Sequence, residues 1–191
     1  MTKRLLPVFL IPVLLLHSAP SAGAADAGAP SARSGADFGP GGVYARIPPR
    51  DEFGRDQLAM FLHWNPDPVG RHRSNLRLLH PSLAAVVRRT QVAHPELPFV
   101  IGSGKRDPAH QRQALRWGWS KTPHGLHQSG EAVDLWPLDA AGRVHFDPGT
   151  QILIGKAMMK AAAELGVRLR WGGVFQSFKN RDRSHFELVS P

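Results

Sequence analysis

Two short polar segments, residues 127–134 and 182–185, constrain the fold of this 191-residue chain more than any other feature. The first reads His127-Gln-Ser-Gly-Glu-Ala-Val-Asp134 and the second reads Asp182-Arg-Ser-His185. Each segment carries an imidazole and a carboxylate on backbone that is typical of turns and strand ends. If these side chains act together, the fold must bring two segments that are distant in the sequence to one point.

The types of side chain in these segments indicate a metal site. Two imidazoles and one carboxylate can hold a zinc ion and leave its fourth position for water. The chain has no cysteine, which excludes a disulfide framework and a thiolate zinc finger. Either histidine taken alone is more often a structural residue than a ligand, but the combination of His127, Asp134 and His185 favours zinc (Zn2+). The sequence therefore predicts a metal-dependent hydrolase.

Asp182 lies three residues before His185, and several roles fit that spacing. As a general base it would take the proton of the attacking water. As a partner of the imidazole it would orient the ring. An Asx turn, or a salt bridge to Arg181 or Arg183, is a structural alternative. The role of Glu187 stays open, because it is consistent with a second base, a substrate contact or a structural residue.

Arg106 is a candidate for binding the substrate. It follows a short apolar stretch, residues 99–101, and a glycine-rich turn, which would place its guanidinium at the edge of a sheet. A guanidinium there can hold a carboxylate through two hydrogen bonds. The alternative is an ordinary surface arginine. Gln111, on the next predicted helix, would brace it.

The first 24 residues have the pattern of a secretory signal peptide. Lys3 and Arg4 precede an apolar stretch, residues 5–16, and Ala22-Gly23-Ala24 supplies a cleavage site of small residues. The apolar stretch is short for a membrane span, so an uncleaved anchor is the less favoured interpretation. We expect an exported protein, periplasmic or secreted, with no stable membrane insertion.

The charge balance favours an anionic partner. The formal net charge is +9, and cleavage after Ala24 would leave 22 basic and 15 acidic residues. Outside the cytoplasm, a basic protein is attracted to cell-wall polymers, lipid headgroups and extracellular nucleic acid. The sequence lacks any motif that reads nucleic acid, so specific binding to DNA or RNA is not expected.

The chain divides into four predicted parts. These are a signal peptide (1–24), a flexible linker rich in Ala, Gly, Ser and Pro (25–43), an N-terminal extension of unclear role (44–75) and a folded domain (76–191). Hydrophobic spacing predicts helices over residues 56–64, 81–93, 109–117 and 151–165 and strands over residues 99–101, 131–138, 167–171 and 185–189. Residues 119–130 are expected to form a loop. This order, without a phosphate-binding glycine fingerprint, predicts an α+β fold.

The predicted strand over residues 131–138 has two distinct faces. Ala132, Asp134 and Trp136 share one face, and Val133 and Leu135 share the other. Gly130 permits a tight turn between His127 and this strand. The strand therefore presents Asp134 beside a small residue that leaves room for an ion.

Taken together, the motifs resemble the zinc D-alanyl-D-alanine carboxypeptidases and the phage-type L-alanyl-D-glutamate endopeptidases, which cut peptidoglycan stem peptides. The family patterns Ser-x-His-x-x-Gly-x-Ala-x-Asp, Trp-Gly-Gly and Asp-x-x-His correspond here to residues 125–134, 171–173 and 182–185. Leu79-His-Pro-Ser-Leu83, and Gly104-Lys-Arg106 with Gln111, match the endopeptidase branch. The resemblance covers roughly residues 76–190.

The resemblance implies both a fold and a set of roles. The fold would be a small α+β domain whose central antiparallel sheet is flanked by helices, as in the hedgehog and D-alanyl-D-alanine peptidase group. His127, Asp134 and His185 would bind zinc, Asp182 would be the catalytic base, and Arg106 with Gln111 would bind the stem peptide. We expect a monomeric endopeptidase. A carboxypeptidase, or a wall-binding module that has lost turnover, is the alternative.

The sequence departs from the family pattern at three places. Gly125 replaces the usual serine two residues before His127. Val174 follows the Trp-Gly-Gly motif where an aspartate is common, and two extra residues lie between Phe178 and Asp182. None of these departures removes a predicted ligand.

Overall fold

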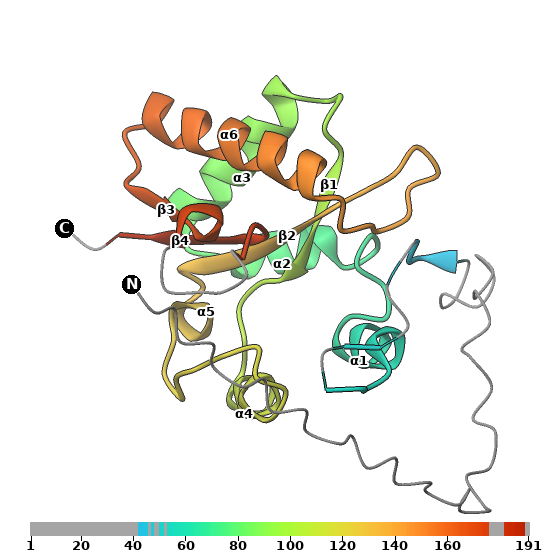
Figure 1. Cartoon of the computed structure of the whole chain (residues 1–191). Coiled ribbons are helices and arrows are strands. Elements are labelled where there is room, and N and C mark those ends of the chain that lie inside the picture. The colour runs from blue at the N-terminus through green and yellow to red at the C-terminus, as the bar shows by residue number, and fades with distance from the viewer. Residues whose placement is uncertain (1–41, 46, 48–49, 52, 176–181, 190–191) are drawn as a thin grey trace, which may run out of the picture. The chain divides into compact units, whose positions relative to one another are not determined.

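The structure is a computed structural model that describes residues 42–45, 47, 50–51, 53–175 and 182–189 (Figure 1). The chain divides into two units, residues 1–31 and 32–191, and every described residue belongs to the second. The predicted signal peptide and nearly all of the predicted linker lie outside the described residues. Those two assignments therefore remain predictions.

A four-stranded antiparallel sheet with the order β1-β2-β4-β3 forms the centre of the second unit. The strands are β1 (Phe99–Ser103), β2 (Ala132–Pro137), β3 (Leu169–Trp171) and β4 (His185–Leu188). In the central pair, Asp134 lies directly opposite His185. The register of the sheet thus joins the two polar segments that the sequence keeps far apart.

One face of the sheet is covered by α3 (Pro81–Ala93) and α6 (Pro148–Glu164), which lie together on that face in Figure 1. Both helices have proline in the first turn, where the missing N–H costs nothing. Asp147 caps α6 by accepting from the backbone N–H of Thr150. The main core lies here, and Val133 and Leu135 contribute to it as their predicted face requires.

The opposite face carries α1 (Gln57–Trp64), α4 (Pro108–Arg116) and the single turn α5 (Leu126–Ser129) (Figure 1). Asp56 and Asp107 cap α1 and α4 through the backbone N–H groups of Ala59 and His110. A second hydrophobic cluster is built on this side. Its buried members are Tyr44, Ile47, Leu58, Trp64, Val100, Ala114, Trp136 and Val144.

This second cluster gives the N-terminal extension a structural role. Tyr44 is fully buried, and its hydroxyl donates to the backbone oxygen of Asn65. Residues from the extension therefore share one core with strand residues Val100 and Trp136. The extension is part of the folded unit in the described residues.

The outer edge of β1 is covered by side chains rather than by another strand. Asn65 donates to the oxygen of Gly102 at 3.0 Å, and Gln91 donates to the oxygen of Phe99 at 3.4 Å. His72, on α2 (His72–Leu78), accepts from the N–H of Ile101 at 3.2 Å. Because these groups satisfy the exposed backbone, the edge is closed to pairing with another chain.

The α+β fold with its small antiparallel sheet is confirmed, but two short helices differ from the sequence expectations. α2 was not predicted, and in the structure it has neither a buried residue nor a side-chain cap. α5 is a four-residue turn between Gly125 and Gly130, too short to show helical spacing. The expectation that His127 lies in a loop is therefore wrong, because His127 lies on α5.

Candidate metal centre

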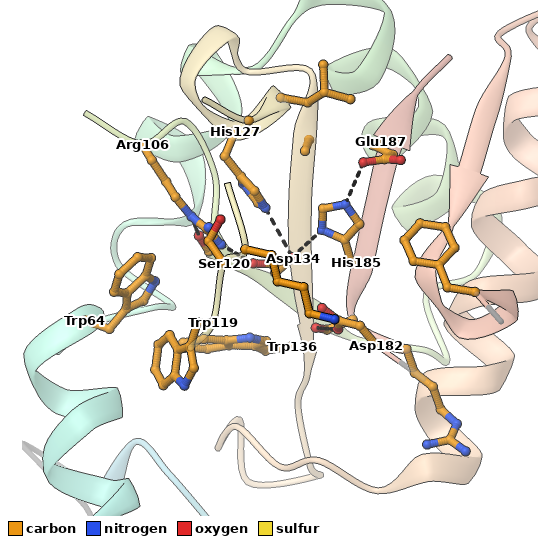
Figure 2. Close-up of a pocket in the computed structure, with 18 of the residues that line it drawn as sticks. Trp64, Arg106, Trp119, Ser120, His127, Asp134, Trp136, Asp182, His185 and Glu187 are labelled. Carbon is orange, nitrogen blue, oxygen red and sulfur yellow. Dashed lines mark hydrogen bonds and ion pairs between the residues drawn. The ribbon is translucent and has the colours of Figure 1, made fainter. Parts of the chain in front are cut away.

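The structure brings His127, Asp134 and His185 together at one end of a cleft (Figure 2). One ligand atom from each residue lies within 4.8 Å of the other two. The Nε2 atom of His127 lies 3.4 Å from Oδ1 of Asp134, and Nδ1 of His185 lies 2.9 Å from the same oxygen. Three elements, α5, β2 and β4, therefore direct one donor atom each to a common point.

His127 is held by groups on both sides of its ring. Its Nδ1 lies 2.9 Å from the backbone oxygen of Gly104. Since a carbonyl can only accept, Nδ1 donates to Gly104, and Nε2 is the ring nitrogen that faces Asp134. The turn that follows requires glycine, because Gly130 has φ +80° and an added Cβ would lie 2.7 Å from the backbone oxygen of Leu78.

His185 is oriented by Glu187, whose Oε2 lies 3.1 Å from Nε2 of the imidazole. Glu187 is itself paired with Arg170 on the neighbouring strand. Burial alone would lower the pKa of His185, but its hydrogen bonds to Asp134 and Glu187 outweigh that effect and raise the pKa to about 10. Of the roles left open for Glu187, these contacts support the structural one. Glu187 orients the ring of His185 so that Nδ1 of that ring is directed at Asp134.

Asp134 accepts hydrogen bonds on both oxygens. Oδ1 faces the two imidazoles, and Oδ2 accepts from Nη2 of Arg106 at 2.9 Å. Burial would raise the pKa of Asp134, but His127, His185 and Arg106 hold it well below its usual range. The carboxylate is therefore ionised and fixed in direction.

Arg106 is a buried residue rather than a surface arginine, with 7% of its surface exposed. Its Nε donates to Oγ of Ser103 at 3.0 Å, and its guanidinium lies 5.1 Å from the centre of the Trp64 ring. The contact with Asp134 was not foreseen from the sequence, although Ser103 and Asp134 are partners in the register of β1 and β2. Arg106 also lines the cleft, where it was expected to meet substrate.

Asp182 lines the same cleft just before β4, and its carboxylate accepts from the hydroxyl of Ser184 at 2.7 Å. The residue is exposed to solvent, yet protein atoms around it hinder hydration of the carboxylate. This desolvation, together with the nearby Asp134 carboxylate, raises the pKa of Asp182. A carboxylate with a raised pKa is a better proton acceptor for catalysis near neutral pH.

The Trp171-Gly172-Gly173 motif fixes the backbone next to Asp182. Nε1 of Trp171 donates to the oxygen of Arg183 at 2.9 Å. A Cβ on Gly172 would lie 2.3 Å from the backbone oxygen of Asp182, so only glycine permits this approach. The motif therefore supports the segment that carries Asp182 and His185.

Gln111 does not brace Arg106 in the described contacts. Its Nε2 instead donates to Oγ of Ser120 at 2.9 Å and to the oxygen of Thr122 at 2.7 Å, which ties α4 to the following loop. The Oε1 atom is buried and has no hydrogen-bond partner among the described groups. Gln111 and the two loop residues that it holds, Ser120 and Thr122, all line the cleft.

The donor set fits zinc by its chemistry. It offers two imidazole nitrogens and one carboxylate oxygen, a set found in catalytic zinc sites. The far side of each ligand is held by another group, namely Gly104, Glu187 and Arg106. Such outer contacts orient the ligands of a metal and support its affinity.

Comparison with known proteins places the chain among the cell-wall peptidases. Residues 69–189 match the family model of the phage L-alanyl-D-glutamate peptidases, which is more than half of the chain, and the chain belongs to this family. It is similar to the crystal structure of the L-Ala D-Glu endopeptidase ChiX of Serratia marcescens, with 34% identity and a TM-score of 0.57. That match covers 62% of this chain and 86% of ChiX. Among curated proteins, none matches the chain significantly.

Family membership confirms the resemblance that the sequence motifs indicated. It also supports a hydrolase that acts on peptidoglycan. The cleft is large enough for an extended substrate, with a volume of about 1210 Å³. It runs from the candidate metal centre to a group of aromatic rings (Figure 2).

Proposed function

We propose that this protein is a zinc-dependent endopeptidase that hydrolyses the L-alanyl-D-glutamate bond of peptidoglycan stem peptides. The observation that carries the proposal is the convergence of His127, Asp134 and His185 within 4.8 Å, in the cleft that Asp182 also lines. Membership of the phage L-alanyl-D-glutamate peptidase family and the similarity to ChiX support the choice of bond.

Nε2 of His127, Oδ1 of Asp134 and Nδ1 of His185 would hold the zinc ion. When bound, zinc supplies a Lewis acid that polarises a carbonyl and lowers the pKa of water. Gly104 and Glu187 keep the two imidazoles in the tautomers that leave these nitrogens available. Arg106 keeps the carboxylate of Asp134 in place from the opposite side.

Asp182 would act as the general base. Its carboxylate lines the cleft, and its raised pKa suits it to accept the proton of the attacking water. It would then deliver that proton to the amine of the leaving D-glutamyl peptide. The hydrogen bond from Nε1 of Trp171 to the backbone oxygen of Arg183 would keep the neighbouring Asp182 in position.

Arg106 and Gln111 would position the stem peptide. A guanidinium has five N–H donors, and the described contacts of Arg106 use only its Nε and one Nη group. It can therefore also donate to a substrate carboxylate or carbonyl. Gln111 would position the substrate through Ser120 and Thr122, the two cleft-lining residues to which its amide nitrogen donates.

Digestion of purified peptidoglycan, followed by mass spectrometry of the fragments, tests the proposal. We expect muramyl-L-alanine ends and peptides with a new D-glutamate amino terminus. The products should disappear with a chelator and return with zinc. The D182N variant should lose roughly 100-fold to 10,000-fold in kcat while retaining zinc, because only the base is removed.

The same experiment separates the alternatives. Release of free D-alanine would identify a carboxypeptidase, and binding to the wall without new termini would identify a non-catalytic module. Activity that survives removal of every metal ion would contradict the assignment of the His-Asp-His group as a catalytic zinc site.

Export to the cell wall belongs to the same proposal. None of the helices in the described part of the chain combines the length and hydrophobicity that a bilayer crossing requires. Residues 1–24 have the composition of a cleavable secretory signal peptide. Amino-terminal sequencing of the protein recovered from outside the cytoplasm should begin at Ala25, and recovery of an uncleaved chain would contradict the proposed processing.

A further inference from the structure

A continuous set of aromatic rings lines the cleft next to the candidate metal centre. We call this set the aromatic wall; it consists of Phe61, Trp64, Trp119, Trp136 and Phe146. The ring of Phe61 lies 5.4 Å from Trp119, 5.2 Å from Trp136 and 4.9 Å from Phe146. Figure 2 shows Trp64, Trp119 and Trp136 grouped on one side of Asp134.

The aromatic wall is not simply an enclosed core. Phe61, Trp119 and Phe146 are only partly buried, although each lines the cleft. Gln57, Phe61 and Trp64 share one face of α1, since they are spaced by four and three residues, and all three line the cleft. A helix of the N-terminal extension therefore presents its side chains to the substrate space.

The peptide part of the proposed substrate does not account for these rings. A stem peptide of L-alanine, D-glutamate, a diamino acid and D-alanine has only small or charged side chains. Partly exposed aromatic rings at the end of a cleft gain free energy by covering an apolar face of a ligand. The ligand must therefore contribute an apolar face that is not a side chain of the peptide.

The covalent structure of the substrate identifies that face. The amino group of the L-alanine is joined by an amide bond to the lactyl ether of N-acetylmuramic acid. If the bond after L-alanine is cut, only one residue separates the reacting carbonyl from the sugar. Asp134 and Trp136 lie on one face of β2, two residues apart, which corresponds to about 6.6 Å along a strand. One alanine and a lactyl group span a similar distance, about 7 Å in extended form.

We propose that the aromatic wall is a subsite for the N-acetylmuramyl pyranose of a stem peptide that is still attached to glycan. The C–H face of the pyranose stacks on Trp119 and its neighbours, and the polar side chains of Gln57 and Gln151 in the same cleft serve its hydroxyl and N-acetyl groups. This inference rests on the proposed cleavage of the L-alanyl-D-glutamate bond. It makes the glycan-linked peptide, rather than free peptide, the preferred substrate.

Two matched substrates test the preference. One is an N-acetylmuramyl peptide that begins with L-alanyl-D-glutamate. The other is the same peptide with an acetyl group on its amino terminus in place of the muramyl sugar. We expect kcat/KM for the muramyl peptide to exceed that for the acetylated peptide by about tenfold, from the burial of one sugar face. The ratio of the two values does not depend on the fraction of enzyme that is folded.

Trp119 and Trp117 provide a matched pair of variants. Both rings are partly buried and contact Trp64, but only Trp119 lines the cleft. The ratio of kcat/KM for the muramyl peptide to kcat/KM for the acetylated peptide should fall to about one in W119A. It should persist in W117A and be largely retained in W119F. The assignment would be overturned by equal kcat/KM for the two peptides with the unaltered chain. It would also be overturned if the ratio of kcat/KM values persisted in W119A or was lost in W117A.

Calorimetric titration of the chelator-treated protein with the same two peptides separates this inference from the proposed function. No turnover occurs without metal, so the titration measures binding alone. If neither peptide is cleaved with zinc present, the proposed function fails. A tenfold tighter binding of the muramyl peptide that depends on Trp119 would still support the glycan subsite, and equal binding would overturn it.

Discussion

Glu187 shows how a single strand position determines the state of a metal ligand. It lies two residues after His185, on the same side of β4, and accepts from Nε2 of that ring. We expect E187Q to weaken zinc binding by about tenfold or more, because the neutral amide makes the imidazole a poorer donor. Competition against a chromogenic chelator measures the affinity.

Glu164 provides the control for this change. It is paired with Arg89 on the helical face of the molecule, remote from the cleft-lining residues. The E164Q variant should bind zinc as tightly as the unaltered chain. An E187Q variant with unchanged affinity would show that the carboxylate of residue 187 does not support the metal site.

Gly125 stands where the family pattern has serine, and the structure has room for that side chain. The backbone of Gly125 is extended, and an added Cβ would lie 3.5 Å from Thr122 and 3.8 Å from Gln111, which are ordinary contacts. Because residue 125 is the N-cap of α5, a serine hydroxyl can accept from the N–H of Gln128. We expect G125S to be more stable than G125A by about 1 kcal/mol in urea unfolding. Equal stability of these two variants would mean that α5 gains nothing from a cap.

At the scale of the elements, β3 and the Gly172-Gly173 turn that follows it support the proposed base, Asp182, through the side chain of Trp171. The ring lies against Gly155 of α6 and Gly173, where any Cβ would clash with it. W171F keeps a ring in this space but removes the donor to the oxygen of Arg183. We expect kcat to fall by about tenfold, equivalent to roughly 1.4 kcal/mol in the barrier, since Asp182 loses its backbone anchor.

W117F makes the same chemical change outside the cleft and serves as the control. Its kcat should match that of the unaltered chain. Zinc content should be normal in both variants. Full activity of W171F would mean that the segment carrying Asp182 is held without the indole.

The protonation state of His72 makes the stability contributed by the edge of β1 depend on pH. Burial lowers the pKa of His72 despite its hydrogen bond with Gln91, and its Nδ1 accepts from Ile101. The native state therefore disfavours the proton, while the unfolded chain takes it up near pH 6.5. The stabilising contribution is complete above that pH and declines as the pH falls from 6.5 towards the lower native pKa.

The H72N variant tests this dependence, because an asparagine oxygen can accept from Ile101 without titrating. The difference in unfolding free energy between the unaltered chain and H72N should be constant above pH 7. It should shift progressively against the unaltered chain as the pH falls below 6.5, because His72 takes up a proton on unfolding and asparagine does not. A difference that does not change with pH would contradict the assignment.

Particular elements show what the sequence could and could not predict. The alternation of residues 132–136 predicted the two faces of β2, and Val133 and Leu135 do lie in the core. The register that sets Asp134 opposite His185 was not predictable, because alternation defines faces but no partner. The contact of Arg106 with Asp134 depends on that three-dimensional arrangement, as does the use of Gln111 to hold Ser120 and Thr122.

At the scale of the whole molecule, the candidate site joins elements from both halves of the fold. The three ligands come from α5, β2 and β4. The groups that hold them come from the turn after β1 and from β4, and Arg170 of β3 pairs in turn with Glu187. An ion that binds only this arrangement stabilises the whole unit by mass action. Zinc at 100 times its dissociation constant should add about 2.7 kcal/mol to the free energy of unfolding.

Thermal unfolding with and without a chelator measures this linkage. The midpoint should fall by several degrees on chelation and recover with zinc, while magnesium, which prefers oxygen ligands, should not restore it. D182N should show the full zinc response, because Asp182 is not one of the converging ligands. D134N should show little response, since the neutral amide replaces the carboxylate that faces both imidazoles. A zinc response of equal size in D134N would place the ion elsewhere and remove the basis of the proposed catalytic centre.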